Sequence, residues 1–166
     1  IVNKVIKFDN FSTVEKLNEW IKESIIECGS CYPMVRIPGV GNRGVAVDVG
    51  ANVGGFCVHA KNHFQKIYAF EPEIINYTIL QKVKEHYQLD NEEAFNTAIH
   101  NKSGVELTLR SYESNHSKEV TCADFVNESF SNIDQKCETI SLTDMMEALG
   151  LDRINYLKLD CEGSEY

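Results

Sequence analysis

Apolar residues recur at two different spacings along the chain, and these spacings predict its secondary structure. Over residues 14–28 an apolar side chain returns every three or four positions, which predicts an amphipathic helix that ends at Gly29. A capping box at 12–15 marks the start of this helix. Turn residues dominate the stretch that follows. We therefore expect a lead-in segment at 1–43 and a main domain at 44–166.

From residue 45 onward, short apolar runs alternate with stretches of helical spacing. This alternation predicts an α/β fold with right-handed crossovers, a Rossmann-like, doubly wound and mostly parallel sheet with helices on both faces. Residues 111–138 are polar and weakly periodic, which predicts a long loop. The main strands are expected at 45–48, 66–70, 94–99 and 154–160, a half-exposed extra strand at 105–109, and helices at 56–64, 75–87 and 141–149.

Three of the four main predicted strands end in a carboxylate, namely Asp48, Glu71 and Asp160. The carboxyl ends of parallel strands meet at one edge of a sheet, and ligands of such sheets bind beyond that edge. The three carboxylates are therefore expected to lie together at a binding site, where their negative charge favours a cation.

The glycine-rich turn at 50–55 allows a ligand to approach bare backbone. Asn52 stands where the dinucleotide-binding fingerprint has its second glycine, which leaves less room for a pyrophosphate. Glu71 stands where a carboxylate accepts both hydroxyls of a ribose. These features predict a nucleoside ligand without a diphosphate. S-adenosylmethionine meets these requirements, with its sulfonium near Asp48 and Asp160.

The composition of the chain indicates which kinds of molecule it is expected to bind. The 166 residues are 43% hydrophobic and 25% charged, which is typical of a folded globular domain. A formal charge of −9 disfavours binding to nucleic acid or an anionic membrane. No apolar stretch has the roughly 18 residues of a membrane helix, and the first residues lack a secretory signal pattern. We therefore expect a soluble cytoplasmic protein.

Six cysteines are scattered through a chain long enough to build its own core, so reduced thiols are expected. Cys28 and Cys31 have the two-residue gap of a redox pair or of half a zinc site. The sequence has no second C-x-x-C, which favours the interpretation of two free thiols.

Five motifs stand in order along the predicted main domain. Together they resemble the FkbM family of S-adenosylmethionine-dependent methyltransferases, and the K-x-D-x-E-G-x-E pattern in the last of them is the most specific. The motifs are Asp48-Val-Gly-Ala-Asn-Val-Gly54, Phe70-Glu-Pro72, Asn96-Thr-Ala98 ahead of Lys102-Ser-Gly104, the segment Thr139 to Met146, and Ile154-Asn-Tyr-Leu-Lys-Leu-Asp-Cys-Glu-Gly-Ser-Glu165.

This resemblance implies a sheet of the seven-strand methyltransferase type. The chain ends at Tyr166, one residue after Glu165 of the last motif. It is therefore expected to be a fragment truncated after the fourth main strand. The resemblance also implies transfer of a methyl group to a hydroxyl of a small molecule or glycan.

The resemblance also implies roles for individual residues. Glu162 is the first candidate for the base that takes the hydroxyl proton or for orienting the acceptor, and Asp160 is the second. Glu162 and Glu165 could instead cap a following helix. Asp48, Gly50, Ala51, Asn52 and Gly54 would line the methionine side of the cofactor, Glu71 would hold the ribose, Ala98 would lie near the adenine, and Asp160 would lie near the transferred methyl.

Other interpretations stay open at this point. The chain could be a nucleotide-dependent oxidoreductase, or a non-catalytic binding module with a methyltransferase-like fold. The clustered carboxylates Asp160, Glu162 and Glu165 would suit a divalent cation, but the resemblance implies no metal. The sequence predicts neither the acceptor nor the oligomeric state.

Overall fold

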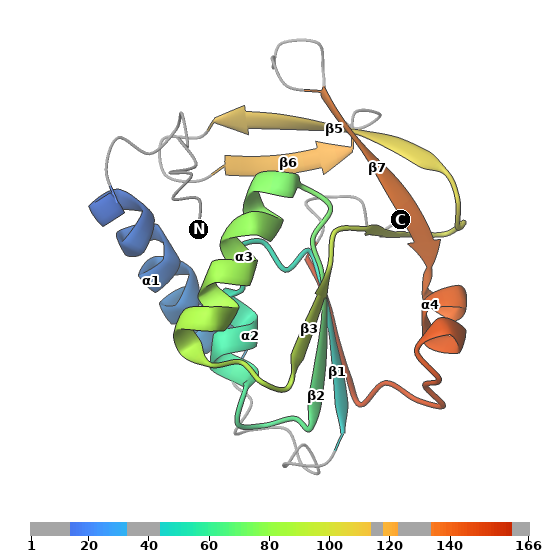
Figure 1. Ribbon diagram of the computed structural model, residues 1–166, viewed down its shortest axis with the longest axis horizontal. Coiled ribbons are helices and arrows are strands. Elements are labelled where there is room, and N and C mark those ends of the chain that lie inside the picture. Colours follow the sequence, from blue (N-terminus) through green and yellow to red (C-terminus); the bar gives the residue numbers. More distant parts are fainter. Residues whose placement is uncertain (1–13, 33–43, 114–117, 123–133, 161–166) are drawn as a thin grey trace, which may run out of the picture.

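The computed structural model describes residues 14–32, 44–113, 118–122 and 134–160 (Figure 1). No helix in these ranges is long and apolar enough to span a membrane. The helices are α1 (Val14–Cys31), α2 (Gly55–Ala60), α3 (Ile74–Tyr87) and α4 (Leu142–Ala148). The strands are β1 (Val45–Val49), β2 (Lys66–Phe70), β3 (Glu92–Phe95), β4 (Ala98–His100), β5 (Glu106–Glu113), β6 (Lys118–Cys122), β7 (Asp134–Ser141) and β8 (Tyr156–Leu159).

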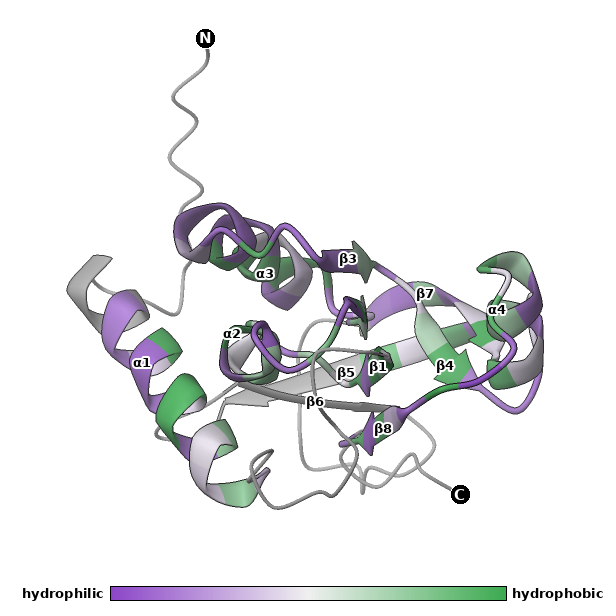
Figure 2. Ribbon diagram, turned by 90° about the horizontal axis from the view of Figure 1, so that it is seen from below, coloured by the Kyte–Doolittle hydropathy of each residue, from purple (hydrophilic) through white to green (hydrophobic). Residues whose placement is uncertain are grey.

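Four of these strands form a parallel sheet in the order β3-β2-β1-β8. In Figure 2 the parallel strands are seen nearly end-on, with α2 and α3 on one side and α4 on the other. This arrangement confirms the predicted α/β fold with helices on both faces of a parallel sheet. It also brings the carboxyl ends of β1, β2 and β8 to one edge.

The apolar run of β1 is continuous because both faces of this strand are buried. Ala46 packs with Phe56 and Leu80 on the side of α2 and α3, whereas Val47 and Val49 pack with Met145 of α4. Successive side chains of a strand point to opposite faces, so a strand covered on both faces needs no polar alternation.

Helix α1 packs against the main domain. Trp20 of α1 is 9% exposed and lies in one cluster with Val53, Ile79 and Val83, which belong to the turn after β1 and to α3. The expected amphipathic helix is thus confirmed, and its apolar face covers the glycine-rich turn. The division of the chain at residue 43 stays a prediction.

The predicted third strand at 94–99 is wrong as a single element. The side chain of Asn96 donates hydrogen bonds to the carbonyls of Glu71 and Pro72, each at 2.9 Å, and the chain changes partner at this point. Strand β3 therefore pairs with β2 in the parallel sheet, while β4 pairs with β7 in a second sheet.

The predicted loop at 111–138 is also wrong in part. Strand β5 extends to Glu113 and pairs antiparallel with both β6 and β7, so the second sheet has the order β4-β7-β5-β6. In Figure 1, β5 and β6 lie beyond the end of the parallel sheet at which α3 begins. The second sheet thus lies next to the edge where a ligand of the parallel sheet would bind.

The turn from β1 into α2 requires an unusual backbone. Gly50, Asn52 and Gly54 have φ values of 75°, 50° and 87°, in the left-handed region that favours glycine. A Cβ at Gly54 would also overlap the side chain of Leu80 on α3. Gly54 therefore serves both the turn and the close packing of α3 against it.

We predict that Gly54→Ala lowers the free energy of unfolding by about 2–4 kcal/mol, because it adds a clash to the left-handed strain. Gly104→Ala is the matched control. Gly104 also has a positive φ, of 70°, but a Cβ there would meet no atom within 4 Å. Urea unfolding should therefore show a cost of only about 1–2 kcal/mol for the control. Equal losses in the two variants would contradict the packing role.

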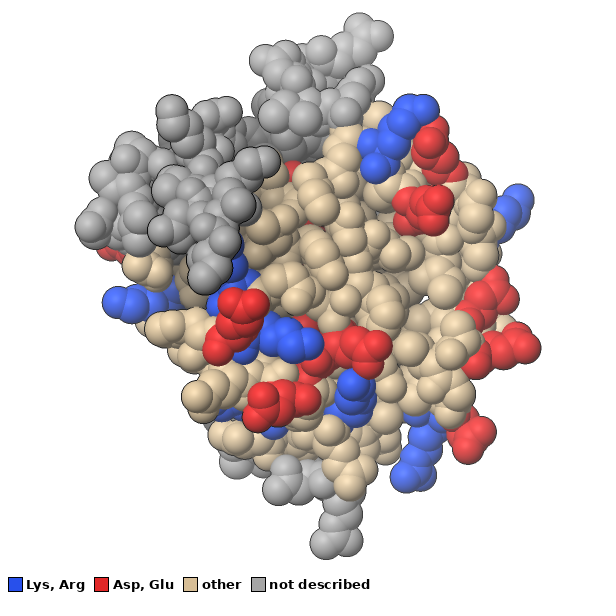
Figure 3. Space-filling view, viewed as in Figure 1, with Lys and Arg blue, Asp and Glu red and all other residues tan. Residues whose placement is uncertain are grey.

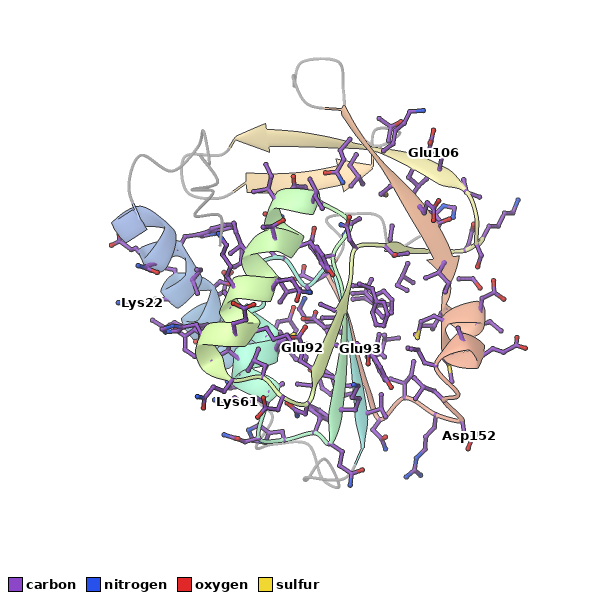
Figure 4. The ribbon with its side chains drawn as sticks, viewed as in Figure 1. Lys22, Lys61, Glu92, Glu93, Glu106 and Asp152 are labelled. Atoms are coloured by element: carbon purple, nitrogen blue, oxygen red, sulfur yellow. The ribbon has the colours of Figure 1, made fainter. Side chains whose placement is uncertain are left out.

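Glu92, at the start of β3, is 2% exposed, and neither of its carboxylate oxygens has a hydrogen-bond partner within the part of the chain that the structure describes. Burial raises the pKa of Glu92 to about 7, against the opposing effect of nearby Lys84. Figure 4 shows Glu92 and its neighbour Glu93 on opposite sides of β3. Glu93 is on the exposed side and pairs with Lys66 at 2.8 Å.

Because the pKa of Glu92 is higher in the folded chain than its ordinary 4.5, the folded state binds the extra proton. This contribution to stability is complete below pH 4.5 and is lost as the pH rises through about 7. The free energy of unfolding of Glu92→Gln, measured with urea, should therefore rise relative to that of the wild type by about 2–3 kcal/mol as the pH goes from 5 to 8. For Glu93→Gln, on the exposed side, the free energy of unfolding relative to the wild type should change by less than about 0.5 kcal/mol over the same pH range. A gain that does not depend on pH would exclude this explanation.

Candidate functional site

The predicted carboxylates do lie along one edge of the parallel sheet. Strand β1 lies between β2 and β8, so the residues that follow β2 and β8 flank the turn after β1. The backbone N–H of Gly50 donates to the carbonyl of Phe70 at 3.0 Å, and that of Asp160 donates to the carbonyl of Val49 at 3.1 Å. Asp48 and Asp160 are therefore close to the turn on one side, and Glu71 is close to it on the other.

Glu71 is fixed by the backbone around it. Its carboxylate is buried and accepts a hydrogen bond from the N–H of Asn52 at 2.7 Å and another from the N–H of Glu73 at 2.9 Å. Each carboxylate oxygen retains a second lone pair that can accept from a ligand hydroxyl. Burial raises the pKa of Glu71 to about 7; the two backbone hydrogen bonds oppose the shift, and the charges of Glu73 and Asp48 add to it.

Two side chains hold the backbone next to Glu71. Asn96 binds the carbonyls of Glu71 and Pro72. Gln135, on β7 of the second sheet, donates to the same Pro72 carbonyl at 2.8 Å and accepts from the N–H of Ile74 at 3.0 Å. Gln135 was missed at the sequence level because it lies in the stretch that was expected to be a loop. No motif marks it.

Lys158 is the first residue of the K-x-D-x-E-G-x-E pattern, but the sequence predicted no role for it in the site. Its ammonium nitrogen lies 2.8 Å from Oδ1 of Asp48, 3.1 Å from the carbonyl of Gly50 and 3.5 Å from Oδ2 of Asp160. The side chains of Asp48 and Lys158 are 0% and 4% exposed. Burial alone would lower the pKa of Lys158, but the charge and hydrogen bond of Asp48, together with Asp160, raise it above its ordinary value. Lys158 therefore stays charged.

The C-terminal end of α1 reaches the same group. The hydroxyl of Tyr32 donates to Oδ2 of Asp160 at 3.2 Å, and a ring nitrogen of His59 lies 3.1 Å from the carbonyl of Tyr32. Burial, followed by the nearby Asp160, raises the pKa of Tyr32 to about 12 despite Lys158. The Tyr32 hydroxyl thus keeps its proton and donates a hydrogen bond to the carboxylate.

The remaining predicted site residues are Ala98, Ala51 and Glu162, and their roles stay predictions. Ala98 is buried in the second sheet beside Leu109 and Cys137, so its place near an adenine stays a prediction. Ala51 is buried in the core, where it packs with residues of α2 and α3. Glu162 lies outside the described residues, so its catalytic role also stays a prediction.

The C-x-x-C pair lies at the end of α1. Both Cys28 and Cys31 are free thiols, and Cys28 is half-buried while Cys31 is exposed. Burial raises the pKa of Cys28 to about 11, in spite of the nearby Lys158. Within the described residues, no three His, Cys, Asp or Glu side chains gather as metal ligands.

No curated protein sequence matches this chain. Among solved structures, the chain is similar to the FkbM methyltransferase of Methylobacillus flagellatus, with a TM-score of 0.50 and 15% identity over 92% of this chain and 42% of that one. For precorrin-6y C5,15-methyltransferase of Geobacter metallireducens the TM-score is 0.35, with 18% identity over 54% of this chain and 45% of the other. For an S-adenosylmethionine-dependent methyltransferase of Clostridium acetobutylicum it is 0.30, with 8% identity and coverages of 83% and 79%.

The chain spans less than half the length of the first two of these structures, 42% and 45%. The first similarity supports the fold of the parallel sheet. Residues 48–166 match the family model described as the methyltransferase FkbM domain. This match covers more than half of the chain and includes the glycine-rich turn, Glu71 and Lys158. The chain therefore belongs to the FkbM methyltransferase family.

Proposed function

We propose that this chain binds S-adenosylmethionine and belongs to an enzyme that methylates a hydroxyl oxygen on a small molecule or a glycan. The observation that carries the proposal is the buried carboxylate of Glu71, which is fixed at the end of β2 beside a left-handed glycine turn. A nucleoside ribose needs an acceptor of this kind at this place in a doubly wound sheet.

The residues present fit this cofactor. Glu71 offers acceptors to the ribose hydroxyls, and Gly50, which has a positive φ, places no side chain between a ligand and the turn. The buried side-chain Oδ1 of Asn52, in the same turn, has no hydrogen-bond partner among the described residues. Asp48 and Asp160 supply negative charge at the end of the site near β8. When bound, S-adenosylmethionine supplies an electrophilic methyl group.

The two candidate bases have different surroundings. Asp160 already accepts from Tyr32 and lies 3.5 Å from the ammonium of Lys158. A carboxylate held by a cation and a donor is better suited to orienting a ligand than to taking a proton. We therefore propose Asp160 as an orienting residue and keep Glu162 as the first candidate for the base.

The charge of the chain supports the proposed class of acceptor. With a formal charge of −9, a polyanionic acceptor is disfavoured. On the face shown in Figure 3, basic and acidic side chains are interspersed, and no continuous basic area is visible. A neutral or cationic hydroxyl compound fits this surface better than a nucleic acid. The cytoplasmic location and the absence of a membrane partner stay predictions.

Isothermal titration calorimetry of the full chain with S-adenosylhomocysteine tests the cofactor. Glu71→Ala should weaken binding by at least tenfold, because it removes the acceptor of the ribose hydroxyls. Glu93→Gln, a carboxylate variant on the neighbouring strand, should bind like the wild type. NAD is the control ligand: binding of NAD without binding of S-adenosylhomocysteine would contradict the proposal and favour an oxidoreductase. Binding of neither ligand would favour a non-catalytic module.

The same titration should depend on pH. The pKa of Glu71 is raised to about 7 in the free chain, and only the ionised carboxylate accepts from both hydroxyls. Affinity for S-adenosylhomocysteine should therefore be about tenfold weaker at pH 6 than at pH 8. Glu71→Gln should remove this dependence. A wild-type affinity that stays constant from pH 6 to pH 8 would show that Glu71 does not titrate in the site.

A further inference from the structure

A buried positive charge lies where the proposed cofactor would bring its own. Lys158 stands directly opposite Asp48 in the register of β8 and β1. Its ammonium contacts Asp48 and the Gly50 carbonyl, and it lies within 3.5 Å of Asp160, which is 52% exposed. The proposed cation site thus already contains a cation of the protein.

Lys158 is held rigidly in this position. Its ammonium lies 5.6 Å from the ring centre of Tyr32 and 5.9 Å from that of Phe56, both within the range of cation–π attraction. Tyr32 also binds Asp160, so the ring and the hydroxyl of one side chain hold both partners of this pair. These contacts hold the charge of Lys158 beside Asp48 and Asp160.

We propose that Lys158 sets the preference of this site between the charged methyl donor and its uncharged product, an inference that rests on the proposed function. Asp48, Lys158 and Asp160 together carry a charge of −1, whereas the two carboxylates alone would carry −2. S-adenosylmethionine has a methyl group and a sulfonium charge that S-adenosylhomocysteine lacks, and the two ligands share their other groups. The ratio of their affinities therefore measures the charge of this group of side chains.

This role has a consequence for the reaction. Methyl transfer removes the positive charge from the sulfur, so a site that binds the sulfonium very tightly stabilises the ground state more than the transition state. Lys158 reduces that ground-state stabilisation while it holds Asp48 and the Gly50 carbonyl in place. Lys158 is in this sense a specificity-determining residue and does not take part in proton transfer.

The experiment compares dissociation constants for the two ligands by calorimetry at pH 8, where Glu71 is ionised. Lys158→Met should raise the preference for S-adenosylmethionine over S-adenosylhomocysteine by about tenfold, the size expected for one nearby charge. Lys158→Arg keeps the charge and should leave the ratio near that of the wild type. The double variant Asp48→Asn with Lys158→Met restores the charge of −1 and should also return the ratio to that of the wild type.

A second variant covers the possibility that Lys158→Met fails to fold, since it leaves Asp48 buried without a counter-ion. Asp48→Asn alone raises the charge of the group to zero and should lower the preference for S-adenosylmethionine by about tenfold. Lys66→Met is the matched control. It removes the same charge from an exposed pair with Glu93 at the opposite edge of the sheet, and the ratio should not change.

The two proposals fail in different ways. If the wild type binds neither ligand, the proposed function is wrong, and the role of Lys158 falls with it. If the wild type binds both ligands and the ratio is the same in Lys158→Met or Asp48→Asn as in the wild type, only the role of Lys158 is wrong. A change of ratio in Lys66→Met as large as that in Lys158→Met would also overturn it, because the effect would then not be local.

Discussion

The buried ion pair between Asp48 and Lys158 is the interaction on which the site depends. The two residues face each other across β1 and β8, and almost none of either side chain is exposed. A buried carboxylate without a counter-ion would be strongly destabilising, so each residue needs the other. Lys158 also binds the carbonyl of Gly50. The same pair therefore joins the central strand, the neighbouring strand and the first residue of the glycine turn.

The site contains a second buried carboxylate whose surroundings are different. Glu71 has no lysine or arginine partner among the described residues and is held by the backbone N–H groups of Asn52 and Glu73. Burial therefore raises the pKa of Glu71 to about 7, whereas Asp48 is bound to a lysine that stays charged. Two buried carboxylates on neighbouring strands thus have different kinds of partner, a lysine for Asp48 and backbone N–H groups for Glu71. The proposed site therefore has an ion pair at its β8 end and, at its β2 end, a carboxylate whose pKa is raised to about 7.

The sequence predicted those parts of the fold that burial dictates. Val47 and Val49 lie against α4 while Ala46 faces α2, so the apolar run of β1 was readable as a strand covered on both sides. The strand-end carboxylates Asp48 and Glu71 were predictable for the same reason. They follow buried strands, and the edge at which parallel strands end is common to all of them.

The parts that the sequence did not predict depend on contacts between residues that are distant in sequence. Asn96 ends the pairing of β3 with β2 through its side-chain hydrogen bonds, and no periodicity marks such a change of partner. Strands β6 and β7 pair with β5 through their backbones, so their polar side chains resemble those of a loop. Tyr32 and Asp160 are separated by 128 positions, and only the folded chain brings them together.

Elements outside the parallel sheet reach the proposed cofactor site from two sides. Gln135 of the second sheet binds the backbone beside Glu71, and Tyr32 at the end of α1 binds Asp160. Both elements therefore contact residues, or the backbone beside residues, that would touch the proposed cofactor. The parallel sheet sets where the proposed cofactor would bind, because its strand ends are fixed by the core. Asp160 is held instead by Tyr32, which directly follows α1. The proposed site thus includes a residue of the segment that the sequence placed outside the main domain.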